Sequence, residues 1–307
     1  MPLGMSYVVR PMKGTGSEPS ATSLAVAAPH RRPLARARSQ RLLVTLFGDY
    51  WAMGSDPLPS SGLVHVLEEF GIAKANARAA LQRLTQKGVL IRTKEGRRTS
   101  YEPSQATVRI LERGRSRIFS RDEEFPWDGS WTLIAFSLPL EDGPLRRLLR
   151  SRLRWLTFWP IFDATWVTPH DRFDAAHEQL ADLEISDALI LRTRDVELFP
   201  GGRARLEAAW RLDELARAYR EYHRRFAPLR DRALAGAVSP KEALVARGEL
   251  VDDWRLLVRD DPDLPLEFMP EDFPRRRSRL LFLETYEALT EPARARFEAL
   301  MGPDDED

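Results

Sequence analysis

The hydrophobic positions between residues 36 and 88 recur every three or four residues in three separate stretches. That spacing places apolar side chains on one face of a helix, so the pattern predicts three amphipathic helices. Their apolar stripes are Leu42, Leu43, Leu46 and Phe47; Leu63, Val64, Leu67 and Phe70; and Ala77, Leu81 and Leu84. Gly48, Gly71 and Gly88 follow the stripes and predict the end of each helix. Ser60 or Ser61 can cap the second helix.

Two short runs of strand-forming residues, VLIRTK and RRTSY, follow the third stripe on either side of Glu95–Gly96. Such runs around a glycine-containing turn predict a β-hairpin. Ile72 and Ala73 leave only a tight connection between the second and third helices. Three helices, a short turn before the third and a hairpin after it are typical of a winged helix-turn-helix. We therefore expect such a domain over residues 35–103.

The third predicted helix, from about Lys74 to Lys87, also has a polar face. Small alanines on that face lie beside Arg, Asn and Gln, so the helix can approach a DNA groove closely while offering donors to bases and phosphates. The hairpin would lie along phosphates or in the minor groove. The candidate DNA-binding residues are therefore Lys74, Asn76, Arg78, Gln82, Arg83, Arg97 and Arg98.

The charge distribution favours a nucleic-acid partner for this half of the chain. The 307 residues carry a net charge of +1, but Arg36–Arg121 holds 16 basic against 7 acidic residues, and the remainder from Asp122 holds 27 against 38. An asymmetry of this kind suggests a nucleic-acid-binding half joined to something else. A solvated basic face, or a winged helix that contacts protein, would have the same composition. The predicted fold favours double-stranded DNA.

The sequence of residues 104–126 predicts a linker helix, in which Ser104 is the N-cap and the arginines face outward. Residues 127–200 then alternate strand and helix patterns in the order β-α-β-β-α-β, which is the ferredoxin-like arrangement. The predicted elements are a strand at Trp131–Leu138, a helix at Gly143–Leu156, strands at Trp159–Ile161 and Ala164–Thr168, a helix at Asp171–Leu183 and a strand at Ala188–Thr193.

Residues 201–301 predict a helical domain. A long helix runs from Arg203 to about Ala235, and SPKE at 239–242 is a capping box in which Ser239 caps the next helix and Glu242 reaches back. A loop rich in proline and acid leads to a helix from about Arg275 and a last helix that follows it. The whole chain is thus expected to be α+β: a winged helix, a ferredoxin-like domain and a helical domain.

The amino-acid composition mainly excludes certain kinds of site and of protein. Cysteine is absent, which excludes disulfides and thiolate-held clusters and fits a reducing cytoplasm. No apolar run approaches the ~20 residues needed to cross a bilayer, so no membrane partner is expected. Residues 1–34, rich in Pro, Gly, Ser and Ala, are expected to be a disordered extension, and residues 302–307 a frayed acidic tail.

Four stretches of this chain resemble the PaaX family of bacterial transcriptional repressors. They are RSQRLLVTLFGDYW, GIAKANARAALQRLTQKGVLIRTKEGRRTSY, WDGSWTLIAF with LRWLTFWPIFDATWVTP, and DPDLPLEFMPEDFPRRRSRLLF. They occur in the family's order from about Ala35 to Met301. The chain departs from the family at Phe273, where tryptophan is usual, and at Arg275, where glycine is expected.

This resemblance implies a winged helix, a Cas2-like ferredoxin fold and a helical C-terminal domain. It also implies a repressor of phenylacetate-type catabolic genes that an aryl-CoA thioester such as phenylacetyl-CoA releases from DNA. A regulator of the same family with a different effector is the nearest alternative. Because one winged helix offers few base contacts, a homodimer that recognises an inverted repeat is also expected.

An aryl-CoA effector would need cations for its phosphates and an apolar, aromatic slot for its acyl group. Arg152, Arg154, Trp155 and Trp159 are the candidate effector-binding residues, because basic and aromatic side chains lie close together in this stretch. The alternative is that these side chains only pack the domain together.

The alternative from another functional class is a Cas2-like metal-dependent nuclease, whose first strand ends in an aspartate. Here that strand ends at Ala135–Pro139 without a carboxylate, and no Walker loop or G-x-S-x-G motif is present. His170 and His177 could share a helix face, and the run Asp260–Asp263 could suggest calcium, but neither set has the further ligands that a metal site needs. We therefore expect no enzymatic activity, no metal and no cofactor.

Overall fold

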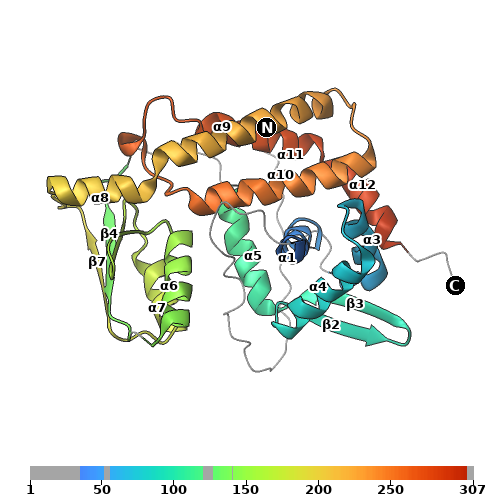
Figure 1. Ribbon diagram of the computed structural model, residues 1–307, viewed down its shortest axis with the longest axis horizontal. Coiled ribbons are helices and arrows are strands. Elements are labelled where there is room, and N and C mark those ends of the chain that lie inside the picture. The colour runs from blue at the N-terminus through green and yellow to red at the C-terminus, as the bar shows by residue number, and fades with distance from the viewer. Residues whose placement is uncertain (1–34, 52–55, 120–126, 140, 303–307) are drawn as a thin grey trace.

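Helices and two small antiparallel sheets make up the computed structural model, which describes residues 35–51, 56–119, 127–139 and 141–302 (Figure 1). The chain is α+β, as its sequence predicts. The expected N-terminal extension, residues 1–34, and residues 303–307 of the acidic tail lie outside the described residues.

The N-terminal unit consists of three helices, a π-helical turn and a three-stranded sheet. Its elements are α1 (Ala35–Leu46), η1 (Phe47–Trp51), β1 (Leu58–Pro59), α3 (Ser60–Glu69), α4 (Lys74–Gln86), β2 (Leu90–Glu95) and β3 (Arg98–Pro103). The three apolar stripes predicted from the sequence meet in one core, where every one of their side chains is buried. α4 packs against both α1 and α3, so its apolar stripe decides which face remains outside.

The first helix does not stop at Gly48, so that expectation is wrong. The chain continues as η1, in which Phe47, Asp49 and Tyr50 are buried. The side chains of Asp49 and Tyr50 contact distant parts of the chain. These contacts stabilise a helical turn at a position where glycine would otherwise favour the end of the helix.

The expected serine cap of α3 is also wrong. The N-cap is Pro59, which makes no side-chain cap bond, while Ser60 and Ser61 lie inside the first turn. Pro59 pairs with Ser100 in the sheet, so the chain enters α3 directly from β1. The sequence did not reveal this two-residue strand.

β2 and β3 form the expected hairpin, paired from Leu90 opposite Pro103 to Glu95 opposite Arg98. Gly96, in the two-residue loop, has a φ of 61°, a left-handed conformation that glycine adopts without steric cost. β1 pairs with β3, which gives the strand order β1-β3-β2. The additional strand ties the base of the hairpin to the start of α3.

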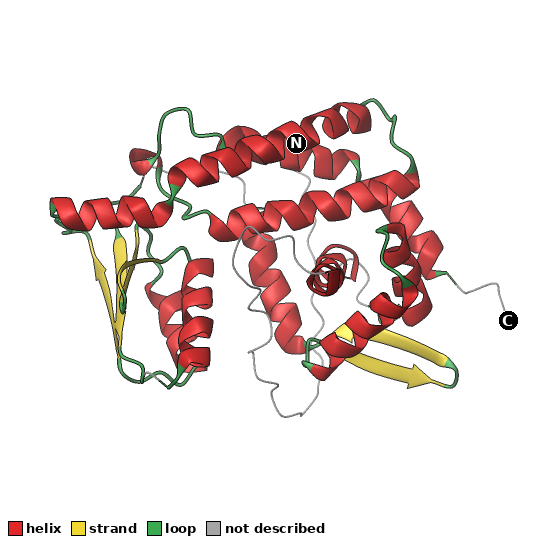
Figure 2. Cartoon of the chain, viewed as in Figure 1, coloured by secondary structure: helices red, strands yellow, loops and turns green. Residues whose placement is uncertain are grey.

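The middle domain has the element order β-α-β-β-α-β, with bounds within two residues of those expected. Its elements are β4 (Trp131–Phe136), α6 (Gly143–Trp155), β5 (Trp159–Phe162), β6 (Thr165–Thr168), α7 (Phe173–Asp182) and β7 (Ala188–Thr193). The four strands are antiparallel in the order β5-β6-β4-β7. α6 and α7 cover one face of this sheet (Figure 2).

The expected single helix from Arg203 to Ala235 is in fact two helices, α8 (Pro200–Trp210) and α9 (Leu212–Leu234). They meet at Arg211, whose φ of 50° and ψ of 44° are left-handed. α8 packs on the middle domain's sheet, opposite α6 and α7, whereas α9 packs on α11 (Arg275–Ala288). Because of this break, α8 packs in the core of the middle domain and α9 in the core of the C-terminal helices.

Two predicted N-caps are confirmed. The Ser104 hydroxyl accepts from the Thr107 N–H at the start of α5 (Gln105–Ile118), and the Ser239 hydroxyl accepts from the Glu242 N–H at the start of α10 (Pro240–Asp260). The Glu242 side chain does not reach back as a capping box requires. It pairs instead with Arg232 of α9, which lies close enough to compete for it.

α10 and α12 (Thr290–Met301) pack directly on the N-terminal unit, so the two regions share one hydrophobic core. Tyr50 of η1 stacks on Phe297 of α12 with ring centroids 4.2 Å apart. The helices approach so closely that a Cβ atom at Gly248 would lie 2.6 Å from the Phe70 ring. The N-terminal unit is therefore packed against the C-terminal helices over a broad surface.

An ion pair between Asp49 of η1 and Arg247 of α10 lies within this shared core. The two side chains are 4% and 1% exposed, and Arg247 Nε lies 2.8 Å from Asp49 Oδ2. The Tyr286 hydroxyl also donates to Asp49, and Arg247 donates to the Tyr286 carbonyl oxygen. Burial alone would lower the pKa of Arg247, but the hydrogen bond and charge of Asp49 outweigh burial and raise it above its ordinary value.

We expect Asp49→Asn to lower the free energy of unfolding by about 3–5 kcal/mol, because the charge of Arg247 would stay buried without its counter-ion. Urea unfolding followed by circular dichroism measures the change. Arg294→Ala, which removes an exposed pair with Glu291 and Glu298, is the control and should cost no more than about 1 kcal/mol. A loss for Asp49→Asn no larger than the control's would contradict a stabilising role for the buried pair.

Candidate nucleic-acid interface

The outer face of α4 is polar and open to solvent. Ala77, Ala80, Leu81 and Leu84 are buried against α1 and α3, which leaves the opposite side of the helix outside. Of the predicted DNA-binding residues on this helix, four are exposed: Lys74, Asn76, Arg78 and Gln82. Helical periodicity in the sequence therefore identified this face correctly.

Two of the predicted α4 residues interact with their own chain. Lys74 Nζ lies 3.7 Å from Glu68 Oε2, and both side chains are exposed, so the pair holds the lysine only weakly. Arg83 is partly buried, and its Nε is enclosed without a hydrogen-bond partner among the described residues. The arginine stem thus lies against the protein, more withdrawn than the polar-face pattern predicts.

The hairpin of β2 and β3 projects from the body of the protein beside α4 (Figure 1). Arg97 and Arg98 are exposed at its end, and the structure gives neither of them an ion pair within the described part of the chain. Arg92 and Lys94 on β2 are exposed as well, and Glu95 is the one acidic side chain between Lys74 and Arg98. An extended, basic projection next to a polar helix can contact phosphates over a distance that the helix alone cannot span.

Arg154 and Trp159, two of the four candidate effector-binding residues, lie together. The Arg154 guanidinium is 4.4 Å from the centroid of the Trp159 ring and 5.7 Å from that of Trp166. Burial lowers the pKa of Arg154, the charge of Asp260 raises it, and nearby arginines including Arg211 lower it further. A cation held on aromatic faces among other cations can attract an anionic group.

The other two candidates point elsewhere, so the structure does not gather all four. Arg152 donates to Gln179 at 3.1 Å and lies 3.6 Å from Asp182, both on α7. Trp155 lies against α5, with the Arg117 guanidinium 5.1 Å from its ring centroid. Consecutive residues of a helix point about 100° apart, which separates these neighbours in the sequence.

Arg117 contradicts the expectation that the arginines of the linker helix face outward. It donates to the backbone oxygens of Trp155 in the middle domain and of Asp261 after α10, the latter at 2.8 Å. Burial lowers its pKa, whereas the nearby Asp263 and Asp261 raise it. One side chain thus connects the linker helix, the middle domain and the C-terminal helices.

The acidic loop after α10 completes this junction, although its sequence predicts only a connecting loop. Arg275 donates to the Leu264 carbonyl oxygen at 3.0 Å and lies 3.5 Å from carboxylate oxygens of both Asp261 and Asp263. His170 Nε2 lies 2.7 Å from the Asp263 carbonyl oxygen. Alternating acids and prolines were visible in the sequence, but their partners lie in other domains.

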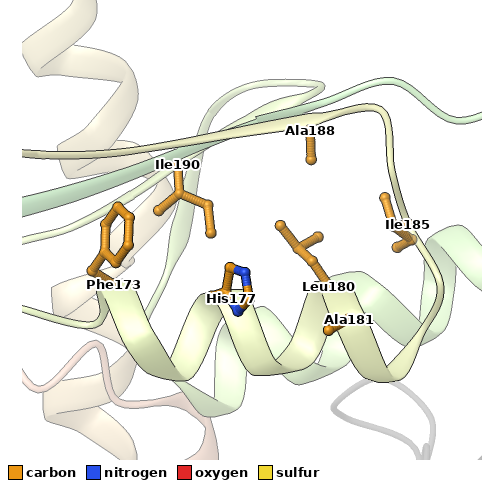
Figure 3. A pocket seen from close by; sticks show the side chains of 7 residues that line it. All are labelled: Phe173, His177, Leu180, Ala181, Ile185, Ala188 and Ile190. Carbon is orange, nitrogen blue, oxygen red and sulfur yellow. The ribbon is translucent and has the colours of Figure 1, made fainter.

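A groove of about 370 Å³ lies between α7 and β7 (Figure 3). Its lining is apolar apart from His177, whose ring points toward the groove from α7. His170 lies instead at the junction with Asp263, so the two histidines noted in the sequence do not form a common site. Among the described residues, no group of three or more His, Cys, Asp or Glu could hold a metal ion.

None of the described helices combines the length and apolar character that crossing a membrane requires.

Three family models match the chain consecutively. A PaaX-like protein model covers residues 36–107, the PaaX protein central Cas2-like domain covers residues 124–204, and the PaaX-like protein C-terminal domain covers residues 210–299. These matches correspond in order to the N-terminal unit, the middle domain and the C-terminal helices.

Two further comparisons agree with the family models. The transcriptional repressor PaaX of Escherichia coli (strain K12) is 27% identical over 259 residues, which is 83% of this chain and 81% of the relative. The solved structure of the uncharacterized protein Rv0674 from Mycobacterium tuberculosis covers 87% of this chain and 99% of its own, with a TM-score of 0.51 and 23% identity, and this likeness concerns the fold alone. Matched by three models over most of its length, the chain belongs to the PaaX family.

Proposed function

We propose that this protein is a cytoplasmic, DNA-binding transcriptional repressor that uses its N-terminal unit as a winged helix-turn-helix. The observation that carries this proposal is the set of exposed basic residues on α4 and on the β2–β3 hairpin beside it. It lies within the segment that matches the PaaX-like family model, and the E. coli relative is a transcriptional repressor. α4 is the candidate recognition helix for the major groove, and the hairpin is the candidate wing.

The middle domain supports a regulator more than an enzyme. Its strand order, β5-β6-β4-β7, fits a ferredoxin-like fold, in agreement with the match to a Cas2-like domain. A Cas2-like nuclease would need a carboxylate where β4 ends, and Phe136 and Ser137 occupy that position. Membership of a repressor family is consistent with a protein that does not act as an enzyme.

The effector we propose is an acyl-CoA, with an aryl-CoA such as phenylacetyl-CoA preferred, and a different CoA thioester or aromatic metabolite is the alternative. The Arg154–Trp159 contact lies where Asp260 of the C-terminal helices approaches the middle domain. Because the N-terminal unit shares a core with those helices, a ligand at this junction would act by moving the middle domain relative to both. Such a ligand must bind the DNA-incompetent arrangement more tightly, since equal affinity for both shifts nothing.

We also propose that the repressor acts as a homodimer on an inverted repeat. One α4 offers few contacts to bases, and two copies related by a two-fold axis double them. The half-sites should lie about 10–10.5 base pairs apart, or a multiple of that spacing.

Replacing both Arg97 and Arg98 with Ala should weaken binding to all DNA sequences and flatten the salt dependence. Each lost phosphate contact lowers the slope of log affinity against log salt by about 0.9. Gel-shift titrations at several salt concentrations measure both quantities. Arg217→Ala with Arg220→Ala removes the same charge from exposed positions on α9 and should leave the slope unchanged. If the hairpin variant and the parent have equal slopes of log affinity against log salt, the hairpin does not contact the DNA phosphates.

Arg154→Ala should weaken binding of phenylacetyl-CoA by about 10- to 100-fold, because a charge-assisted hydrogen bond contributes roughly 1.5–3 kcal/mol. Calorimetry with phenylacetyl-CoA, free CoA and phenylacetate separates the contributions of the two parts of the ligand. Arg152→Ala is the control, since Arg152 points toward α7, and it should bind nearly as tightly as the parent. Parental affinity in a folded Arg154→Ala protein would place the site elsewhere, and no binding of any CoA thioester would exclude this effector.

A further inference from the structure

Large exposed apolar side chains are concentrated in the middle domain. Among the described residues, ten large apolar side chains are exposed, and five of them belong to β5, β7 or the loop from β7 to α8. They are Phe162 (56%), Leu189 (53%), Leu191 (46%), Val196 (40%) and Phe199 (73%). A concentration of this kind on one surface indicates contact with another macromolecule, whereas single exposed apolar residues do not.

The strand register places most of these residues on one face of the sheet. Phe162 pairs with Thr165, Thr165 with Ala135, and Ala135 with Leu189, so these four form one row across the strands. Partners in antiparallel strands point to the same side of a sheet. Arg205 of α8 lies 5.7 Å from the Phe162 ring centroid, which identifies this as the face on the α8 side.

A second row on the same face is partly covered. Leu191 pairs with Leu133, Leu133 with Val167, and Val167 with Trp159. α8 buries Val167 and Trp159 but leaves Leu191 exposed. Figure 1 shows the consequence: α6 and α7 cover one side of the sheet, and below α8 the other side has no element over it. We call the uncovered surface of Ala135, Phe162, Thr165, Leu189 and Leu191 the open sheet face.

We propose that the open sheet face binds a second copy of this chain, so that the middle domains form the dimer that the proposed function requires. This inference rests on that function. A two-fold interface needs a surface that complements itself. Here α8 covers one half of this side of the sheet and leaves the other half open. An inverted copy would lay its own α8 over the open half.

The outer side of α8 suits this packing. Leu206 and Trp210 point toward the sheet, and Gly201, Ala204 and Ala208 are exposed on the opposite side of the helix. Small side chains let a helix lie close to a flat apolar surface. With a two-fold axis parallel to the strands, the two α8 helices would contact each other, and the two open sheet faces would not meet. The axis therefore runs across the strands, with each α8 on its partner's open sheet face.

Charge complements the inverted arrangement. The three loops at the end of the sheet away from α8, residues 137–142, 163–164 and 184–187, contain acidic residues and no Lys or Arg. These acids are Glu141, Asp142, Asp163, Glu184 and Asp187, of which Asp163 lies 3.5 Å from Arg150 of α6. On α8, Arg203 and Arg205 are exposed, and Arg203 pairs with Glu207 of the same helix, so the charge that remains for a partner is that of Arg205. An axis across the strands brings the arginines of each α8 toward the acidic end of the other copy, whereas an axis along the strands would bring like ends together.

Two-fold symmetry uses both surfaces of each copy. Stable interfaces bury about 800 Å² on each partner, and in a two-fold dimer each copy contributes both an α8 and an open sheet face. The middle domain lies at one end of the longest axis of the molecule, and the N-terminal unit with α4 lies toward the other end (Figure 1). A dimer held here would place the two candidate recognition helices far apart, at a spacing that depends on the angle between the middle domain and the rest of the chain.

The experiment replaces Leu189 and Leu191 with Glu in the full chain and measures the oligomeric state by sedimentation equilibrium. The parent should be a dimer, and the double variant should dissociate at least 100-fold more readily, because its carboxylates would face the apolar side of the partner. Leu280→Glu is the matched control: Leu280 is also 53% exposed, but it lies on α11. Circular dichroism verifies that each variant is folded.

A second variant, Ala204→Arg, tests α8 independently of the sheet. It adds a large side chain at an exposed position and should also give monomers, even if the glutamate variant does not fold. A monomeric parent overturns the proposal, and so does a folded dimer of either variant with parental affinity. Binding to a single DNA half-site separates this inference from the proposed function, because monomers should keep the salt slope that the hairpin arginines produce. Loss of half-site binding in the parent would instead contradict the function.

Discussion

The buried contact between Asp49 and Arg247 is the constraint on which the arrangement of the two ends of the chain depends. A charged pair in an apolar core is tolerated only when every partner is in place, and here Tyr286 and the flanking helices supply the remaining hydrogen bonds. Sliding α10 along η1 would leave a guanidinium or a carboxylate unpaired. The contact therefore specifies one relative position of the N-terminal unit and the C-terminal helices.

Regulation depends on how the middle domain meets the rest of the chain. The N-terminal unit shares one core with α10 and α12, and α9, α10 and α11 form a second core. The middle domain has its own core beneath α6 and α7, but its α8-side core also includes Leu264 and Phe268 from the segment after α10. These parts meet through Arg117, the loop around Asp261 and the left-handed break at Arg211. Hydrogen bonds from Arg117 to backbone oxygens can exchange for others at little cost, but the contacts of Phe268 with Trp131 and Trp210 belong to an apolar core, which cannot slide freely. A signal from the middle domain to α4 would thus have to rearrange the contacts of this junction.

Much of the local structure could be predicted because it follows from short-range periodicity. The stripes that include Leu43, Leu63 and Leu81 identified three helices, and burial of those stripes then decided that Arg78 and Gln82 would face outward. The hairpin followed from Gly96 between two strand-forming runs. The middle domain's alternating pattern likewise gave its elements within two residues. Arg83 shows the limit of this reasoning. It lies at the edge of the polar face, where periodicity does not decide exposure, and neighbouring elements partly bury it.

The sequence by itself therefore determined the elements, the exposed basic face of α4 and the family to which the chain belongs. The tertiary structure alone decided which distant residues meet. Asp49 and Arg247 are 198 positions apart and each has an ordinary local context, so no periodic pattern marks them as a pair. Arg152 and Arg154 are two positions apart and yet face α7 and Trp159 respectively. The physical reason is that helical and strand periods govern which side a residue takes, while the partner on that side depends on how whole elements pack.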